Sequence, residues 1–170
     1  MLSQELLNKV GPHRLQGSVP SYEDLYEEFF ENKDVKVINE VEGYYQVIVS
    51  IDDATKNLLN LLTPVKKSIR QAKLEKVNFQ ILYQPTGVCK TLYHKDHISK
   101  GQIVTLVSFG EDKELHLTED PGSDDYVSLT LKNKTYCYLL DQHLYYHKTI
   151  ANNNVSGRIA VVIIPGNDCM

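Results

Sequence analysis

The stretch VNFQILYQPTGVCKTLYHKDHISKGQIVTLVSFGEDKELHLTEDPGSDDYVSLTLKNKTYCYLLDQHLYYHKTIANNNVSGRIAVVIIP, residues 77–165, decides the fold of this 170-residue chain. It contains eight short runs rich in β-branched and aromatic residues, and clusters of Gly, Pro, Asn, Asp and Lys separate most of them. The runs are residues 77–83, 87–94, 102–109, 113–119, 126–132, 135–141, 144–150 and 157–165. Eight strands at this rhythm predict a jelly roll, also called a double-stranded β-helix.

The residues before this stretch predict helices and one hairpin. A helix over 1–10 should end at Gly11-Pro12, and Ser21 should cap a second helix through YEDLYEEFF, residues 22–30. VKVINEV (35–41) and YYQVIVSI (44–51), separated by Glu42-Gly43, predict a β-hairpin.

A further helix should follow the hairpin, with Asp52 or Asp53 as its cap and with Leu58, Leu59 and Leu62 at helical spacing. Pro64 should interrupt it, and a second piece should run to about Leu74. The chain is thus predicted to be α+β, mainly β, and a single domain over 1–170. Residues 1–75 would form a helical and hairpin support or lid, and residues 76–166 a double-stranded β-helix catalytic core.

Composition narrows the class of protein. The chain is 42% hydrophobic and 24% charged, as in ordinary globular domains. No apolar run approaches the roughly 20 residues of a membrane helix, and the start lacks the features of a secretory signal. We therefore expect a cytoplasmic protein. The three cysteines lack CxxC spacing, so neither a disulfide framework nor a zinc knuckle is predicted.

The net charge of -4 argues against a surface that binds nucleic acid over its whole extent. The net charge does not exclude a local contact with nucleic acid. The candidate is the basic stretch Lys66, Lys67, Arg70, Lys73 and Lys76, which is either a solvated helix face or a polyanion contact.

A possible metal site lies in the second and seventh runs. Because strand side chains two residues apart share a face, His94 and Asp96 can reach one ion, and His147 would complete a 2-His-1-carboxylate set. That donor set binds iron(II) and leaves coordination positions open. His143 lies four residues before His147 on the same predicted face, so periodicity does not separate the two. His97 is a further rival, or a partner of the ligands.

Arg158 stands eleven residues after His147, at the start of the last apolar run. A buried guanidinium there could form two charge-assisted hydrogen bonds to a carboxylate. In an eight-stranded roll the seventh and eighth strands belong to opposite sheets that face one cavity. The order HxD, His and Arg therefore predicts a metal on one wall and a carboxylate-binding cation on the other.

The chain resembles the AlkB-like iron(II)/2-oxoglutarate dioxygenases, including those within plant RNA virus replicases. The resemblance rests on ILYQPTGVCKTLYHKD (81–96), QIVTLVSFGEDKELHL (102–117) and YYHKTIANNNVSGRIAVVII (145–164). It implies His94, Asp96 and His147 as iron ligands, with 2-oxoglutarate and O2 as co-substrates. It also implies that Arg158 binds the distal carboxylate of 2-oxoglutarate and that Tyr83 helps to hold this co-substrate.

The resemblance further implies oxidative demethylation of N-alkylated nucleobases, with single-stranded or damaged RNA or DNA as substrate and an intracellular, including viral, setting. Tyr44 and Tyr45 would then contribute to a lid on which a base stacks. Ile164 stands where AlkB-like proteins usually carry a second arginine, and Ile81 where they usually carry asparagine. Two alternatives therefore stay open: an oxygenase that hydroxylates a protein side chain or small metabolite, and a non-catalytic binding module. No obligate partner or oligomeric state is predicted.

Overall fold

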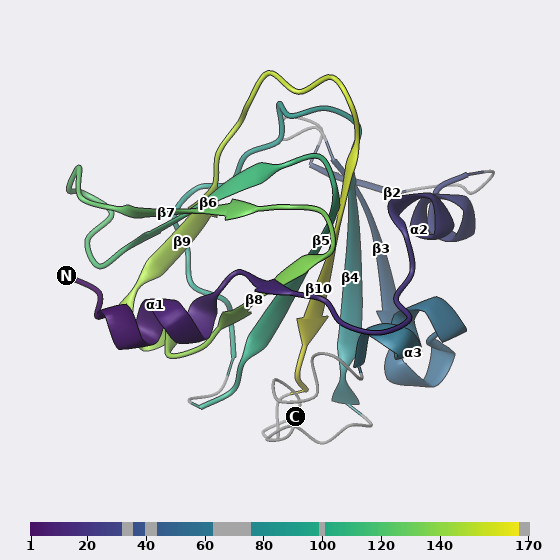
Figure 1. Cartoon of the computed structure of the whole chain (residues 1–170), viewed down its shortest axis with the longest axis horizontal. Helices are drawn as coiled ribbons and strands as arrows, with labels where there is room; N and C mark the ends of the chain where they lie inside the picture. The colour runs from purple at the N-terminus through teal and green to yellow at the C-terminus, as the bar shows by residue number, and fades with distance from the viewer. Residues whose placement is uncertain (32–35, 40–43, 63–75, 99–100, 167–170) are drawn as a thin grey trace.

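The computed structural model of the chain describes residues 1–31, 36–39, 44–62, 76–98 and 101–166. In these residues two antiparallel sheets form two layers (Figure 1). The large sheet has the order β1-β8-β5-β10-β4-β3-β2, and the small sheet has the order β7-β6-β9. The strands are β1 (His13–Arg14), β2 (Lys36–Asn39), β3 (Tyr44–Ser50), β4 (Asn78–Gln84), β5 (Val104–Gly110), β6 (Lys113–Thr118), β7 (Val127–Leu131), β8 (Thr135–Leu139), β9 (Tyr146–Thr149) and β10 (Arg158–Ile164).

This arrangement confirms the predicted mainly β jelly roll. Seven of the eight predicted runs contain a strand, β4 to β10, and β9 and β10 lie in opposite sheets as expected. The prediction for residues 87–94 is wrong: they form no strand, and they join β9 through one isolated bridge, between His94 and His147, and through hydrogen bonds between Thr91 and Thr149. The interruption has a local cause, because the hydroxyl of Thr91, rather than its backbone carbonyl, accepts the amide of Thr149.

The predicted hairpin exists as β2 and β3, and its place is at one edge of the large sheet, where β3 pairs with β4. A two-residue strand, β1, was not predicted and extends the other edge by pairing with β8. The predicted turn Glu42-Gly43, the helical piece up to Leu74 and most of the basic stretch lie outside the described residues.

Within the described residues, three α-helices precede the roll: α1 (Gln4–Val10), α2 (Tyr22–Phe29) and α3 (Lys56–Leu62). Ser21 caps α2 as predicted, in a capping box with Asp24. Asp52 and Asp53 do not cap α3; they lie in a separate 3-10 turn, η1 (Ile51–Asp53). The helix starts later than predicted. Leu58 and Leu61 face the sheet, whereas Leu59, which was predicted to share the face of Leu58, is 44% exposed.

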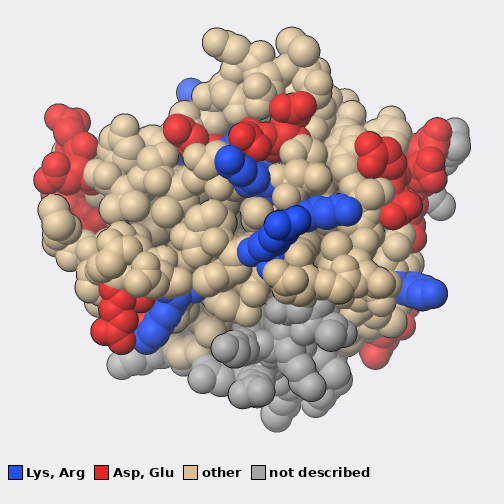
Figure 2. Space-filling model, viewed as in Figure 1, with Lys and Arg blue, Asp and Glu red and all other residues tan. Residues whose placement is uncertain are grey.

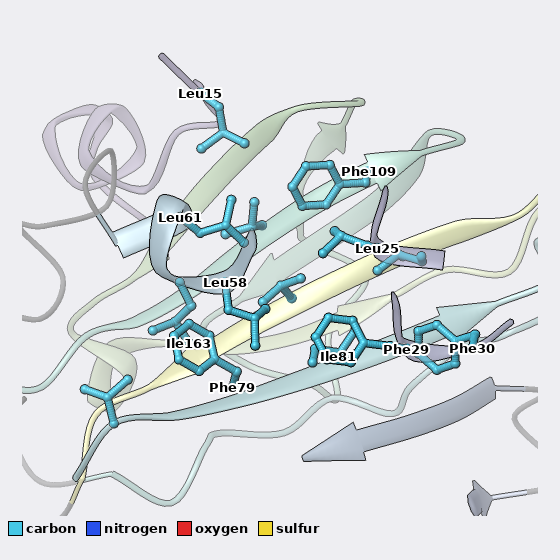
Figure 3. Packing of buried hydrophobic residues seen from close by; sticks show 14 residues of the cluster. Leu15, Leu25, Phe29, Phe30, Leu58, Leu61, Phe79, Ile81, Phe109 and Ile163 are labelled. Atoms are coloured by element: carbon cyan, nitrogen blue, oxygen red, sulfur yellow. The ribbon is translucent and has the colours of Figure 1, made fainter. Parts of the chain in front are cut away.

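The described residues form two apolar clusters. The first lies between helices α2 and α3 and the outer face of the large sheet (Figure 3). There Leu25, Leu58 and Leu61 pack on strand residues such as Phe79 and Ile163. The second cluster lies between the two sheets and includes Leu6 and Val10 of α1. The central strands of the large sheet, such as β5 and β10, therefore bury both of their faces, which explains the continuous apolar run of β10.

Among the described residues, no helix has the length and apolar character needed to cross a membrane.

Candidate metal centre and carboxylate-binding end

Three side chains predicted as metal ligands converge between the sheets. The Nε2 atom of His94 lies 3.7 Å from one carboxylate oxygen of Asp96, and Nε2 of His147 lies 3.6 Å from the other. The donor atoms of the three residues all lie within 4.8 Å of one another. The N–O distances exceed those of hydrogen bonds, so the donors face a shared gap instead of pairing directly.

Backbone pairing and a side-chain clamp produce this convergence. His94 and His147 exchange both backbone hydrogen bonds across their bridge, each at 3.0 Å, which sets the two rings 4.2 Å apart. Asp96 lies beyond the bridge, so strand alternation does not place it. Gln142 does: its amide nitrogen donates to the Asp96 carboxylate at 2.9 Å, and its oxygen accepts from the Asp96 backbone amide at 2.8 Å.

Gln142 is a residue of the candidate site that the sequence did not reveal. It lies in a 3-10 turn, η3 (Gln142–Leu144), and is 46 positions from Asp96 along the chain. It is buried, and its amide also donates to the carbonyl of Leu139. Every polar atom of the side chain therefore has a partner, which fixes one orientation of the Asp96 carboxylate.

The two histidines have their Nε2 atoms turned to the shared gap. Nδ1 of His94 lies 2.7 Å from the carbonyl of Leu92, which can only accept, so Nδ1 carries the proton and Nε2 retains a lone pair for a metal. Burial lowers the pKa of His147, and although the Asp96 carboxylate opposes this effect, the adjacent His94 adds to it. The His147 ring is therefore neutral near neutral pH, which is the form that binds metals.

The rival histidines lie away from this cluster. His143 is exposed in η3, and its backbone carbonyl accepts a hydrogen bond from Lys95. His97 is exposed at the rim of the cavity that holds the three donors. Of the alternatives that the sequence left open, the structure thus brings His147 to His94 and Asp96, and leaves His143 outside.

The cluster opens into two adjoining pockets, of about 520 Å³ and about 360 Å³, whose linings share Lys95, Asp96 and Ile98. The larger part contains the three donor residues and is otherwise mainly apolar; its walls include Leu82, Leu106, Leu115, Leu139, Val162 and Ile164. Ile164, which occupies the position of the usual second arginine, therefore adds an apolar side chain to the wall of this cavity.

Arg158 lies on the inner face of the large sheet, as predicted, and is 3% exposed. Its guanidinium donates to Gln84 at 3.0 Å and to Ser108 at 2.9 Å, while its Nε atom is buried with no hydrogen-bond partner. Along β10, Val162 lines the cavity, and Arg158 lies two inward-facing positions away, beyond Ala160. The cation therefore stands deeper between the sheets than the metal-binding donors.

The structure does not bring Tyr83 to this site, so its predicted contact with a co-substrate is wrong. Adjacent strand residues point to opposite faces, and Tyr83 lies on the outer face of β4. There its ring contacts those of Tyr26, Phe30 and Tyr45, with centroids 5.2 to 6.1 Å away. The neighbouring Gln84 points inward instead and accepts from Arg158. Tyr45 packs on Tyr83 and so belongs to the same aromatic group.

The donor chemistry of the cluster fits iron(II). Two imidazole nitrogens and one carboxylate, all on one side of an open cavity, are the donor set of mononuclear iron(II) oxygenases. One of the two rings also has the usual hydrogen bond from its second nitrogen, since His94 donates to a backbone carbonyl. His147 departs from this pattern, because its Nδ1 atom is buried with no partner among the described residues.

Comparisons with known proteins agree on the fold. No protein-family model and no curated protein sequence matches the chain. Among solved structures, it is similar to a prolyl hydroxylase from Trichoplax adhaerens in complex with a hypoxia-inducible-factor peptide fragment, with 10% identity, a TM-score of 0.56, and coverage of 78% of this chain and 67% of that one. It is also similar to OsALKBH1, with 11% identity, a TM-score of 0.51, and coverage of 72% and 78%. The chain therefore has the jelly-roll fold found in iron(II)/2-oxoglutarate oxygenases.

Proposed function

We propose that this chain is an iron(II)- and 2-oxoglutarate-dependent oxygenase in which His94, Asp96 and His147 hold the metal and Arg158 binds the distal carboxylate of the co-substrate. The observation that carries the proposal is the convergence of these three donors at a cavity between the two sheets. A non-catalytic module would have no need for three donors aimed at one point, with a buried glutamine that fixes the carboxylate.

In the proposed reaction, the residues of the chain would have separate roles that follow from their positions. Iron(II) and 2-oxoglutarate, when bound, supply the oxidation of a substrate C–H bond by O2, with release of succinate and carbon dioxide. Gln142 keeps the Asp96 carboxylate oriented, and the bridge between His94 and His147 fixes the spacing of the two rings. The apolar walls, Leu106 and Val162 among them, exclude water from the reacting centre.

Within this class we propose an N-alkylated nucleobase in RNA or DNA as the substrate. The segment similarity to AlkB-like proteins and the fold likeness to OsALKBH1 support the choice. So does the surface behind the two histidines: the ammonium of Lys95 lies 4.5 Å from the ring of Tyr146, and that of Lys148 lies 4.2 Å from the ring of Tyr93. Such cation and aromatic pairs can contact both phosphates and bases.

The charge distribution limits how such a substrate would bind. On the face shown in Figure 2, acidic side chains gather at both sides, and the basic side chains of the described residues lie mainly in a short group near the middle. The formal net charge is -4. A short single-stranded segment held locally beside the cavity therefore suits the chain better than a long duplex that needs many phosphate contacts.

Hydroxylation of a protein side chain or a small metabolite is a second candidate, and Ile164 favours it. This residue puts an apolar side chain on the wall of the cavity, where a second arginine would have offered a charge for a nucleic acid or co-substrate. The fold likeness to the peptide-bound prolyl hydroxylase adds support.

The test separates these possibilities. The protein, iron(II) and 2-oxoglutarate are incubated with a 1-methyladenine oligonucleotide, and formaldehyde and succinate are measured. We expect formaldehyde release that is lost in His147→Ala and retained in His143→Ala. Succinate formation without any response to the oligonucleotide would reject the nucleobase and favour the second candidate. Failure of the wild-type protein to bind manganese or iron(II) would overturn the oxygenase itself.

A further inference from the structure

The outer face of the small sheet carries aromatic rings and ammonium groups side by side. On β6, Leu115 and Leu117 point into the apolar cluster between the sheets, so the intervening His116 points to the opposite, outer face. On that face His116 pairs with Lys148 of β9, and the ammonium of Lys148 lies 4.2 Å from the centre of the Tyr93 ring. Residues of β6, of β9 and of the irregular segment before β5 thus form one continuous row.

A second row runs beside the first. Thr118 of β6 pairs with Tyr146 of β9, and the ammonium of Lys95 lies 4.5 Å from the centre of the Tyr146 ring. Tyr126, directly before β7, stacks on His116 of the first row, with ring centroids 4.1 Å apart and planes 11° from parallel. We call the residues that carry these rings and ammonium groups the aromatic strip: Tyr93, Lys95, His116, Tyr126, Tyr146 and Lys148.

The lysine end of the strip is positively charged. In the described part of the chain, no carboxylate forms a salt bridge with Lys95 or Lys148. Lys95 donates to the backbone carbonyl of His143, and both ammonium groups also contact rings, so all of these partners are neutral. Lys95 further lines both pockets that adjoin the metal donors. This end therefore offers two cations to an anion that lies beside the candidate metal centre.

The other end of the strip suits a flat, neutral group better than an anion. Tyr126 is 55% exposed, and since His116 covers one side of its ring, the other side is open to a ligand. Acidic groups lie near this ring: a carboxylate oxygen of Glu114 is 3.3 Å from Nε2 of His116, and the exposed Asp124 and Asp125 precede Tyr126. These carboxylates would repel a phosphate but not the face of a neutral base.

We propose that the aromatic strip binds a single-stranded nucleic acid, with phosphates at Lys95 and Lys148 and one unpaired base stacked on Tyr126. Proteins hold single strands through this combination of cations along the backbone and rings against the bases. A duplex fits less well because its bases are already paired and stacked, and an acidic peptide would make no use of the open ring. The inference rests on the proposed function for its class of substrate, and it adds a binding surface outside the metal centre and its cavity.

The test measures how affinity depends on salt. A short labelled single strand without methylated bases, made both as RNA and as DNA, is titrated with the full chain at several salt concentrations, and binding is followed by fluorescence anisotropy. Lys148→Met should reduce the slope of log affinity against log salt by about 0.7, the value for one lost phosphate contact on a single strand. Tyr126→Ala should weaken binding by about fivefold or more at every salt concentration, as expected for one lost stacked base, and should leave the slope unchanged.

Two matched variants serve as controls. Tyr126→Phe keeps the ring and should bind like the wild type. Lys56→Met removes an exposed lysine of α3, which lies on the opposite side of the molecule beyond the large sheet, and should keep the slope. An equal change of slope in Lys56→Met and Lys148→Met would reject the strip, because the effect would then come from net charge alone.

Further outcomes separate the strip from the function on which it rests. If the wild type releases formaldehyde from the methylated oligonucleotide while Lys148→Met and Tyr126→Ala bind single strands as tightly as the wild type, the strip is rejected and the proposed function stands. If both variants change binding as expected but no formaldehyde is released, the strip stands and nucleobase demethylation fails. Failure of the wild type to bind either strand would overturn the inference, as would equal binding of duplex or polyglutamate with the same dependence on Tyr126.

Discussion

At the scale of single residues, Gln142 determines the geometry of the candidate metal centre. It holds Asp96 from two sides, through the backbone amide and through the carboxylate. Glutamine has no metal-binding signature of its own, and 46 positions separate the two residues. Only the fold brings them together, and this is why the donors could be predicted from the sequence while their support could not.

Replacement of Gln142 should weaken metal binding without removing any donor. Gln142→Leu keeps a similar volume but leaves the Asp96 carboxylate and amide without partners. We expect the affinity for Mn²⁺ to fall by roughly 10- to 100-fold, which is the usual effect of losing such a support. Calorimetric titration measures it, with the exposed Gln16→Leu as control. An unchanged Mn²⁺ affinity in a folded Gln142→Leu protein would contradict this role.

Lys113 should make stability depend on pH. Burial lowers its pKa from 10.5 to about 8, and although Cys89 opposes this effect, Arg158 adds to it. Between these two values the unfolded chain binds more protons than the folded one, so the free energy of unfolding should rise with pH. The rise is at most about 3 kcal/mol.

Urea unfolding of the metal-free protein at about pH 7 and about pH 10 measures this effect. Lys113→Met should lack the contribution, and the difference between the two proteins isolates it from the tyrosines that titrate in the same range. A wild type and a variant with equal pH dependence would show that Lys113 carries no burial penalty.

At the scale of elements, the sequence predicted the positions of the strands well, but it did not predict which face of a strand each side chain occupies. Runs of β-branched and aromatic residues located β4 to β10 because these strands bury both faces or one face in a regular way. The segment over 87–94 has the same composition, yet the Thr91 hydroxyl replaces a ladder hydrogen bond. The role of Tyr83 was inferred from the resemblance alone, and the pattern of β4, a strand buried on both faces, did not show that this ring lies on the outer face.

The orientation of α3 can be tested directly, because it determines which of its leucines packs against the large sheet. Leu61 is fully buried against the large sheet, while Leu59 is 44% exposed. Leu61→Ala should lower the free energy of unfolding by about 2 to 5 kcal/mol, because it leaves a cavity in the core. Leu59→Ala should change it by less than about 0.5 kcal/mol. Chemical denaturation of both variants measures the difference, and equal losses would contradict the described facing.

At the scale of the whole molecule, the order of motifs along the chain was enough to predict a two-layered roll with metal donors and a cation between the layers. The order could do so because a jelly roll sends its seventh and eighth strands to opposite sheets, as β9 and β10 show. It could not reveal the burial of Lys113, since a lysine at the start of a strand usually lies at the surface. Lys113 is buried because the two sheets pack against each other, and this packing joins residues that are far apart in the sequence.

Metal binding should stabilise the whole fold. The donors come from β9 and from the irregular segment before β5, so an ion would add a link between two parts of the chain that one isolated bridge and the hydrogen bonds of Thr91 join. With Mn²⁺ at about 100 times its dissociation constant, the free energy of unfolding should rise by about 2.7 kcal/mol. Thermal unfolding with and without Mn²⁺ measures this, and the midpoint should rise in the wild type and in His143→Ala but not in His147→Ala. A similar rise in His147→Ala would place the ion elsewhere.

The two ends of the cavity differ in exposure, and this difference determines the order in which two molecules can bind. The side chain of His94 is 43% exposed, whereas Arg158 at the far end is almost completely enclosed. A small molecule bound for the enclosed end has to travel past the metal donors, and a large one that rests at the exposed end would block that route. Under the proposed function, the keto acid must therefore enter first and the bulky reactant second, and an excess of the bulky reactant would slow turnover by trapping the empty form.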